Sequence, residues 1–507
     1  MSGILKRQCS LSLTALCALM LGGQCDPVMA DQAEGRGDRF PPFCWDTVPR
    51  ALAVHKPTPW VDEDYARIAR HDFLQIAVTE KDLALAAEVK KFNPRITILG
   101  YKNLVLHVQG MADPLFHNHP DWFLYTQGKP EVNGRGRNSR PLYDLRKPEI
   151  REYWIRDVAR ILDIPILDGI FFDAYAKAVN YLPVQRATGQ DPQTDYIAGY
   201  HAMMEEHLKR SGNTRKIRIG NYLRADKNET AIPEVMKYLD GSYLEGFDHF
   251  PALPPGIHSY EEYLAAGMQA VQQVAQAGKI IVLHLSAQND KDIKLAADGI
   301  EEAGASPGVY HNFEYKLAIF LICAERHSYF QYQADPRVAG DAQSWAPDFP
   351  EFRKPLGAPK GPAVKQGFTY TREFEHASVW LDLTKRQGRI TWKASYLEAK
   401  VLTPRHGSDQ VPTNAFQCRI EFDRPVKKGS GTISLYRLGD RKKLASVPVE
   451  SDAVTEQDGR VVVIQFPVQL KDKTRYSITV EKGAFGDRDG LKFLGFPMLG
   501  EWMFTTR

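Results

Sequence analysis

The segment at residues 164–180 constrains the fold more than any other part of this chain. Its core reads Leu-Asp-Gly-Ile-Phe-Phe-Asp over residues 167–173, which is too apolar for a strand exposed on one face. A parallel strand buried on both faces has this composition, and it shows polarity only where it surfaces at its carboxyl end. The segment therefore predicts a central strand of a parallel sheet, with Asp173 at the edge where catalytic groups of such sheets gather.

Apolar runs of similar length alternate with helical patterns between residues 40 and 335, which is typical of parallel strands joined by crossover helices. Eight is the number of strands that closes a (β/α)₈ barrel, so we expect a TIM barrel of the α/β class. The eight expected strands are residues 43–47, 73–78, 96–101, 169–173, 217–222, 241–245, 280–285 and 328–332.

A second carboxylate, Glu245, follows another expected strand in the same way as Asp173. Glycosidic bonds are cleaved by a pair of carboxylates, one acting as proton donor and the other attacking the sugar or activating water. The sequence thus predicts Asp173 as the ionised partner and Glu245 as the general acid. A retaining and an inverting mechanism both remain open, because they differ in the separation of the two carboxylates. Asp168 and Asp240 begin their strands, and we expect them at the opposite, stabilising end of the barrel.

Polar and aromatic side chains at the other expected strand ends are candidates for binding sugar hydroxyls and sugar faces. The predicted substrate-binding residues are Trp45, Asp46, Tyr101, Asn103, Asp144, Tyr175, Asn221, Tyr222, Arg224 and His284. A connection of unusual length, residues 102–147, follows the third strand, and we place it over the barrel mouth.

Three regions are expected along the chain. Lys6 and Arg7 precede an apolar stretch at residues 11–21 and a small-residue site ending at Ala30, which predicts a cleaved signal peptide over residues 1–30 and a secreted or periplasmic protein. The barrel would occupy residues 31–400, with a late strand appendage at 364–395. From residue 401 to 507 short alternating strands predict an Ig-like β-sandwich.

Composition narrows the function further. A net charge of +3 over 507 residues gives no indication of nucleic-acid binding, and no later segment is long and apolar enough to span a membrane. Cys44, Cys323 and Cys418 would remain after signal removal, and their spacing suggests neither a disulfide framework nor a metal site. His117 and His119 lack a third ligand at a supporting spacing, so no metal and no cofactor is expected.

The Asp-Gly-Ile-Phe-Phe-Asp strand, together with Pro120-Asp121-Trp122 and Tyr143-Asp144-Leu145, resembles bacterial barrel-type glycoside hydrolases. The similarity is to the hypothetical glycosyl hydrolase family 15 group, and more distantly to the endo-α-1,4-polygalactosaminidases of glycoside hydrolase family 114. Residues 419–426 and 500–506 resemble the bacterial Ig-like domain. The resemblance implies a (β/α)₈ fold and a carbohydrate substrate.

The sequence thus predicts a secreted, monomeric glycoside hydrolase acting on an extracellular or cell-envelope polysaccharide. Two alternatives stay open at this point. One is a non-catalytic carbohydrate-binding or envelope-scaffold protein on a degenerate barrel. The other is a different enzyme on the same fold, such as a polysaccharide lyase or deacetylase.

Overall fold

The computed structural model describes residues 40–54, 59–134, 139–175, 182–188, 195–212, 214–223, 236–248, 253, 256–285, 313–332, 349–393, 396–414, 416 and 418–507. The expected signal peptide lies outside these residues. Within them, no helix is long and apolar enough to cross a membrane.

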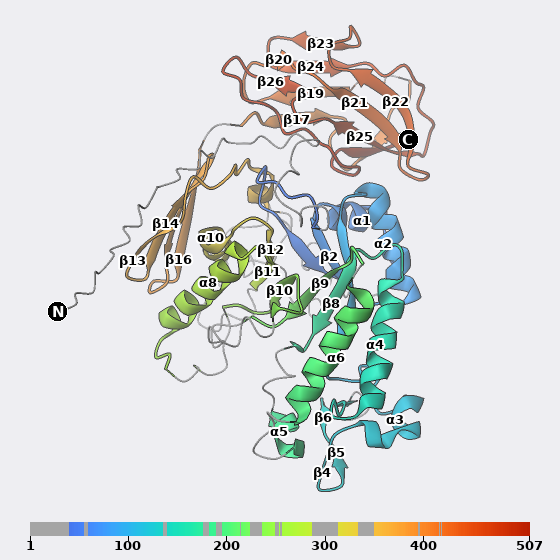
Figure 1. Ribbon diagram of the computed structural model, residues 1–507. Coiled ribbons are helices and arrows are strands. Elements are labelled where there is room, and N and C mark those ends of the chain that lie inside the picture. The colour runs from blue at the N-terminus through green and yellow to red at the C-terminus, as the bar shows by residue number, and fades with distance from the viewer. Residues whose placement is uncertain are drawn as a thin grey trace, which may run out of the picture.

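Eight parallel strands form one sheet in chain order, seven of them at the expected places, and the fold class is confirmed (Figure 1). Phe330 of the last strand pairs in parallel with Arg50 beside the first, and its amide donates to the Pro49 carbonyl at 2.8 Å, so the sheet closes on itself. The strands are β1 (Ala51–Ala53), β2 (Phe73–Ile76), β3 (Thr97–Asn103), β8 (Gly169–Asp173), β9 (Ile217–Asn221), β10 (Gly241–Leu244), β11 (Ile280–Leu285) and β12 (Ser328–Tyr332).

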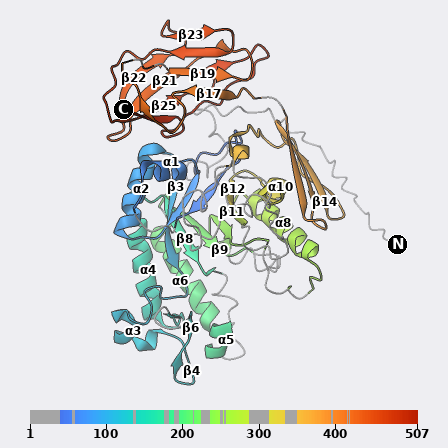
Figure 2. The same cartoon turned by 180° about the vertical axis from the view of Figure 1, so that it is seen from behind.

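Helices cover the outside of this barrel, and the figures show them around the sheet (Figure 1 and Figure 2). Their apolar faces follow the helical period, as in α4, where Ile150, Trp154, Val158 and Ile161 are buried. The described helices of the barrel are α1 (Asp62–Ala69), α2 (Glu80–Phe92), α4 (Pro148–Leu162), α5 (Leu182–Thr188), α6 (Asp195–Ser211), α8 (Tyr260–Gln276) and α10 (Phe313–Cys323).

The first expected strand is wrong in position, since residues 43–47 are not a strand and β1 begins at Ala51. The alternating Phe43 and Trp45 that suggested a strand pack instead beneath the barrel. The Phe43 ring meets Tyr329 and His327, both at the start of β12, at centroid distances of 5.7 and 5.3 Å. Aromatic alternation here reflects packing against the amino end of the barrel rather than sheet pairing.

At that amino end, two Asp-Gly pairs tie neighbouring strands together. The Asp168 carboxylate accepts the Ile98 amide at 2.8 Å, and the Asp240 carboxylate accepts the Arg218 amide at 2.9 Å. A side chain at either following glycine, Gly169 or Gly241, would collide with the backbone carbonyl of the next strand. The expected placement of Asp168 and Asp240 at the stabilising end of the barrel is therefore confirmed.

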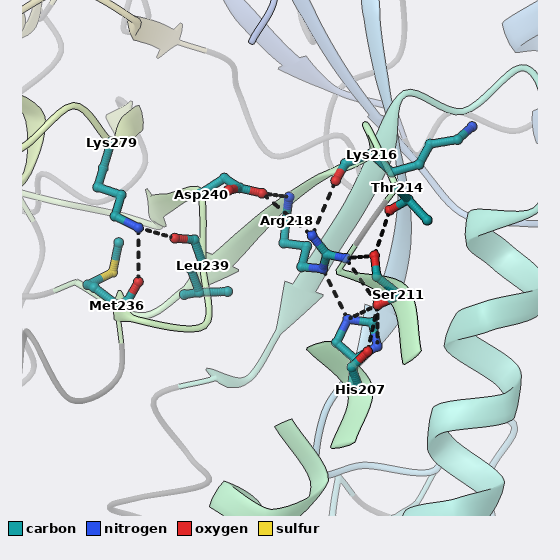
Figure 3. A network of polar contacts seen from close by, with 9 residues as sticks. All are labelled: His207, Ser211, Thr214, Lys216, Arg218, Met236, Leu239, Asp240 and Lys279. Atoms are coloured by element: carbon teal, nitrogen blue, oxygen red, sulfur yellow. Dashed lines mark hydrogen bonds and ion pairs between the residues drawn. The ribbon is translucent and has the colours of Figure 1, made fainter. Parts of the chain in front are cut away.

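Two lysines complete this pattern on the alternate strands. Lys216 precedes β9 and donates to the carbonyls of Ile164 and Leu167, which lie just before β8. Lys279 precedes β11 and donates to the carbonyls of Met236 and Leu239, just before β10 (Figure 3). In both the β8–β9 pair and the β10–β11 pair, a lysine before the second strand thus donates to backbone carbonyls just before the first strand.

The long connection after β3 forms its own small substructure at the carboxyl end of the barrel. Buried His107 contacts the Tyr143 hydroxyl at 3.0 Å and Asp113 at 3.2 Å, which fastens the two ends of the connection together. Its elements are α3 (Pro114–Asn118), η2 (Pro120–Trp122), β4 (Tyr125–Thr126), β5 (Lys129–Pro130), β6 (Val132–Asn133) and β7 (Arg140–Pro141).

The last barrel helix, α10, is mostly apolar and is buried along nearly its whole length. One side packs on β12 and α8, and the other is covered by an antiparallel four-stranded sheet. The sheet consists of β13 (Val364–Gln366), β14 (Thr369–Glu373), β15 (Ala377–Asp382) and β16 (Gln387–Trp392), and η6 (Pro350–Arg353) precedes it. A helix with no solvent-facing polar side must be buried on both sides by apolar surfaces. The four-stranded sheet buries the outer side of α10 and is therefore an integral part of the barrel domain.

Two further sheets at the carboxyl terminus form the expected all-β unit. One contains β17 (Ala399–Thr403), β19 (Cys418–Phe422), β24 (Val461–Ile464) and β23 (Val454–Gln457). The other contains β18 (Ser408–Val411), β27 (Met503–Thr506), β25 (Arg475–Val480), β21 (Thr432–Arg437) and β22 (Lys442–Pro448), with β20 (Lys427–Lys428) and β26 (Phe485–Gly486) paired separately. Cys44, Cys323 and Cys418 are all free thiols.

The sandwich rests on α1 and α2, at the end of the barrel away from the long β3–α4 connection (Figure 1 and Figure 2). Arg441 binds Glu88 at 2.5 Å and lies over the Phe92 ring, while Arg475 binds Glu63 at 3.1 Å. The sandwich therefore leaves the carboxyl end of the barrel uncovered.

We predict that Arg372→Met lowers the free energy of unfolding by about 3 kcal/mol or more. The buried guanidinium donates to the carbonyls of Leu321, Ile322 and Ala324 at the end of α10, and it pairs with Glu325 at 3.1 Å. Its loss leaves these carbonyls and the carboxylate without their donor. Urea unfolding would measure the change. Arg389→Met in β16 of the same sheet, at an exposed position, should stay within about 0.5 kcal/mol of the wild type.

A second prediction concerns acid stability. Burial, together with the adjacent Arg218 guanidinium, lowers the pKa of His207 to about 3, and His207 Nε2 accepts the Arg218 Nε proton at 3.2 Å (Figure 3). Between pH 6.5 and about 3 the unfolded chain therefore binds a proton at this residue that the native protein does not. The contribution of neutral, buried His207 to the free energy of unfolding is therefore fully present above pH 6.5, and it decreases as the pH falls toward 3.

His207→Gln keeps an acceptor for Arg218 but cannot titrate. Below pH 6 the free energy of unfolding of the wild type should decrease with falling pH. In His207→Gln we expect this decrease to be smaller, by up to about 1.4 kcal/mol per pH unit. Urea unfolding at several pH values between 4.5 and 7.5 would measure this slope. A slope identical to that of the wild type would contradict the prediction.

Candidate active site

Asp173 stands at the carboxyl end of β8, after three residues whose side chains are buried. Its Oδ2 accepts the Tyr101 hydroxyl at 2.7 Å and Asn103 Nδ2 at 3.2 Å. Its Oδ1 accepts Asn221 Nδ2 at 3.1 Å and the Ala174 amide at 2.6 Å. Four donors thus surround one carboxylate and fix its orientation.

The donors themselves are held in place. Asn103 Oδ1 accepts the amides of Val105 and Leu106, so its Nδ2 must face Asp173. Burial, together with the neighbouring Asp173 carboxylate, raises the pKa of Tyr101, so this phenol remains a donor at neutral pH. The amide of Ala174 reaches Asp173 from a left-handed backbone conformation with φ of 57°, which an alanine adopts only when its surroundings impose it.

Glu245 follows β10 directly and is exposed at the same end of the barrel. Its Oε2 accepts Asn221 Nδ2 at 3.1 Å. The two hydrogens of one amide group therefore bind the two carboxylates, one each. The closest oxygens of Asp173 and Glu245 are consequently no farther apart than twice 3.1 Å.

The turn after Glu245 is docked on the end of β11. His284 Nδ1 accepts the Gly246 amide at 3.2 Å, and the His284 carbonyl accepts the Phe247 amide at 3.0 Å. The His284 ring stacks on Tyr243 at a centroid distance of 6.0 Å. Sequence reasoning treated His284 as a substrate ligand, and the structure gives it contacts that support the Glu245 turn.

The structure therefore brings Asp173, Glu245, Tyr101, Asn103 and Asn221 into one hydrogen-bonded cluster, which we call the carboxylate cluster. The bridging position of Asn221 was not predicted, because a strand-end asparagine in a sequence does not reveal which side chains flank it. The left-handed Ala174 carried no sequence signal either.

Two aromatic candidates are wrong. Tyr175 and Tyr222 are fully buried, and their rings meet edge to face at 6.0 Å. Tyr175 also packs on Tyr200 of α6 at 5.6 Å. These rings turn away from the mouth and fill the layer between sheet and helix, so neither can stack on a sugar.

Trp45 and Asp46 are also wrong as substrate ligands, because the segment that bears them precedes β1 at the amino end of the barrel. Asp46 Oδ1 binds Lys482 of the sandwich at 2.8 Å. The Trp45 ring packs on Phe43 at 4.9 Å. The error follows directly from the misplaced first strand.

Asp144 is likewise removed from the cluster. Both of its carboxylate oxygens bind the Arg146 guanidinium, at 2.7 and 2.8 Å, and the residue is buried. The contact stabilises the approach to α4. Arg224 lies outside the described residues, and among the described residues no group of three or more side chains is arranged to hold a metal ion.

A closed parallel barrel with two carboxylates joined at its carboxyl end has the architecture of a glycoside-hydrolase-like barrel. Residues 90–378, more than half of the chain, match the model of the hypothetical glycosyl hydrolase family 15, and the chain belongs to this family. Residues 394–506 match the bacterial Ig-like domain. The resemblance noted in the sequence is thus confirmed for both parts.

Solved structures of similar fold include several glycosidases. The glycoside hydrolase domain of PelA from Pseudomonas aeruginosa is 12% identical, with a TM-score of 0.38 over 59% of this chain and 97% of that one. The maltogenic α-amylase AmyB from Thermotoga neapolitana is 12% identical, with a TM-score of 0.40 over 84% of this chain and 99% of that one. The α-galactosidase TtGalA from Thermus thermophilus is 14% identical, with a TM-score of 0.37 over 69% and 70%. No curated protein matches the sequence.

Proposed function

We propose that this protein is a secreted glycoside hydrolase that cleaves a glycosidic bond of an extracellular or cell-envelope polysaccharide through Asp173 and Glu245. The observation that carries the proposal is the contact of one amide, Asn221 Nδ2, with both carboxylates at 3.1 Å. This contact places two carboxylates within reach of a single sugar linkage, as glycosidic cleavage requires.

The surroundings of the two carboxylates support a different role for each. Asp173 receives four hydrogen bonds that hold its carboxylate in one orientation, which suits the group that attacks the anomeric carbon. Glu245 is exposed and receives the single described side-chain contact from Asn221, so it can exchange protons with water and with a leaving group. Asp173 is accordingly the nucleophile, and Glu245 is the general acid and base.

The reaction follows from these roles. An Asp173 oxygen bonds to the anomeric carbon while the bond to the leaving oxygen breaks, and the Glu245 proton moves to that oxygen. A water molecule then gives its proton to Glu245 and attacks the same carbon, which releases the sugar and restores the Asp173 carboxylate. Two inversions at one carbon give net retention.

The carboxylate separation favours retention over inversion. Inverting enzymes hold the groups roughly 6.5 to 9.5 Å apart to admit a water, whereas retaining enzymes hold them roughly 5 to 5.5 Å apart. The closest oxygens here lie no farther apart than twice 3.1 Å, a short separation that is in line with retention.

Secretion is supported by the apolar amino-terminal segment with its basic start and by the Ig-like sandwich. The sandwich packs on α1 and α2 and does not lie over the carboxyl end of the barrel (Figure 1), which is in line with a large substrate there. The sugar and its linkage would come from a screen of the purified mature protein against bacterial exopolysaccharides.

We predict that Asp173→Asn lowers kcat by at least about 10³-fold and that Glu245→Gln lowers it by about 10² to 10⁴-fold on the polysaccharide that the screen identifies. Reducing-end release would measure both. Glu88→Gln makes the same carboxylate-to-amide change beneath the sandwich and should keep wild-type activity. Full activity in Asp173→Asn would refute the assignment.

A further prediction concerns stereochemistry. Proton NMR during the first minutes of hydrolysis should show a product with the anomeric configuration of the substrate. If the opposite anomer forms first, then the two carboxylates act across a water molecule and Asp173 is a base rather than a nucleophile.

A further inference from the structure

A buried ion pair lies next to the Glu245 turn. Lys316 Nζ of α10 binds Asp248 Oδ2, and the two side chains are 0% and 2% exposed. The second oxygen of Asp248 has no hydrogen-bond partner among the described residues. Neither sequence reasoning nor the carboxylate cluster accounts for this pair.

Stability alone is a poor explanation for such a pair. Burying two charges costs several kcal/mol for each ion, and apolar residues of similar volume are often equally stable or more so. The other buried residues of α10, such as Leu317, are mostly apolar. An apolar side chain at position 316 would therefore suit the surroundings. A buried pair is better explained where it fixes a geometry that apolar contacts would leave loose.

The segment that the pair can fix is the turn from Glu245 to Asp248. Asp248 comes three residues after Glu245, and the intervening amides of Gly246 and Phe247 are bound by His284. The turn is therefore fastened to β11 through His284 and to α10 through Lys316. Glu245 itself is exposed, and its described contact is the one to Asn221.

We propose that Asp248 and Lys316 are positioning residues that hold Glu245 against Asn221, at the place from which it delivers its proton. This inference rests on the proposed function for its consequence in catalysis, but the placement of Glu245 can be measured without any activity. Neither residue needs to touch the substrate.

The test is the double variant Asp248→Leu with Lys316→Met, which replaces the pair by apolar side chains of similar length. We expect its midpoint of urea unfolding to equal or exceed that of the wild type. We expect kcat on the identified polysaccharide to fall by about 10 to 100-fold, with KM within about twofold, because a displaced acid slows bond cleavage without weakening binding.

Two readouts separate positioning from a general structural effect. A dinitrophenyl glycoside of the same sugar needs little proton donation in the first step. The loss of kcat/KM on it, which reports that step, should therefore be several-fold smaller than the loss of kcat/KM on the polysaccharide. A crystal structure of the double variant should show that Glu245 Oε2 has left Asn221 Nδ2. Lys482→Met, which breaks an ion pair with Asp46 beneath the sandwich, should change neither readout.

The single variant Asp248→Asn provides the same two readouts if the double variant does not fold, since it keeps the shape of the side chain and an acceptor for Lys316. An unchanged 3.1 Å contact between Asn221 and Glu245, together with unchanged kcat, would overturn the inference. A wild-type protein inactive on every polysaccharide would refute the proposed function, while the crystal structure would still decide the positioning.

Discussion

Asp168 and Asp240 accept hydrogen bonds from backbone amides of the preceding strands. These contacts fix the positions of the residues that follow, up to the carboxyl end of the barrel. Each aspartate fixes the start of its own strand against a neighbour, and each strand then rises in a regular register. Asp173 and Glu245 both come five residues after these anchors. Because the rise per residue in a strand is nearly constant, two equal counts from two equal anchors bring the carboxylates out at similar heights. The amino end of the barrel thereby determines the geometry of the carboxyl end.

The same reasoning explains the position of Asn221. Strands β8 and β10 are separated by β9, so their backbones lie about 10 Å apart, at about 4.8 Å per strand. Carboxylates on these strands can meet only if their side chains lean toward each other over β9. Asn221 ends β9 and fills this space with one amide group that serves both. Asp173 and Glu245 share this one donor, and the two groups stay close enough for a single bond between sugars.

Sequence patterns predicted the barrel well because buried parallel strands have an unmistakable composition. The bounds expected for β8, β11 and β12 are those observed, and the strand-end carboxylates were found from them. Strand one failed because Phe43 and Trp45 alternate as a strand does while packing on rings below the barrel. Tyr175 and Tyr222 failed for a related reason, since a tyrosine after a strand can face either the mouth or the helices. Such choices depend on neighbours that are distant in sequence, and periodicity does not contain them.

The four-stranded sheet after the barrel shows how a part far from the site can still act on it. Helix α10 lacks a polar face, so without this sheet its outer side would be exposed to water and its packing on the barrel would loosen. Arg372 of the sheet binds the carbonyls at the end of α10 and fixes the helix along its axis. Lys316 of the same helix binds Asp248 beside the Glu245 turn. A continuous chain of contacts therefore runs from the outer sheet through one buried helix to the proposed proton donor, and a barrel without its late strands would lose the support on which Glu245 depends.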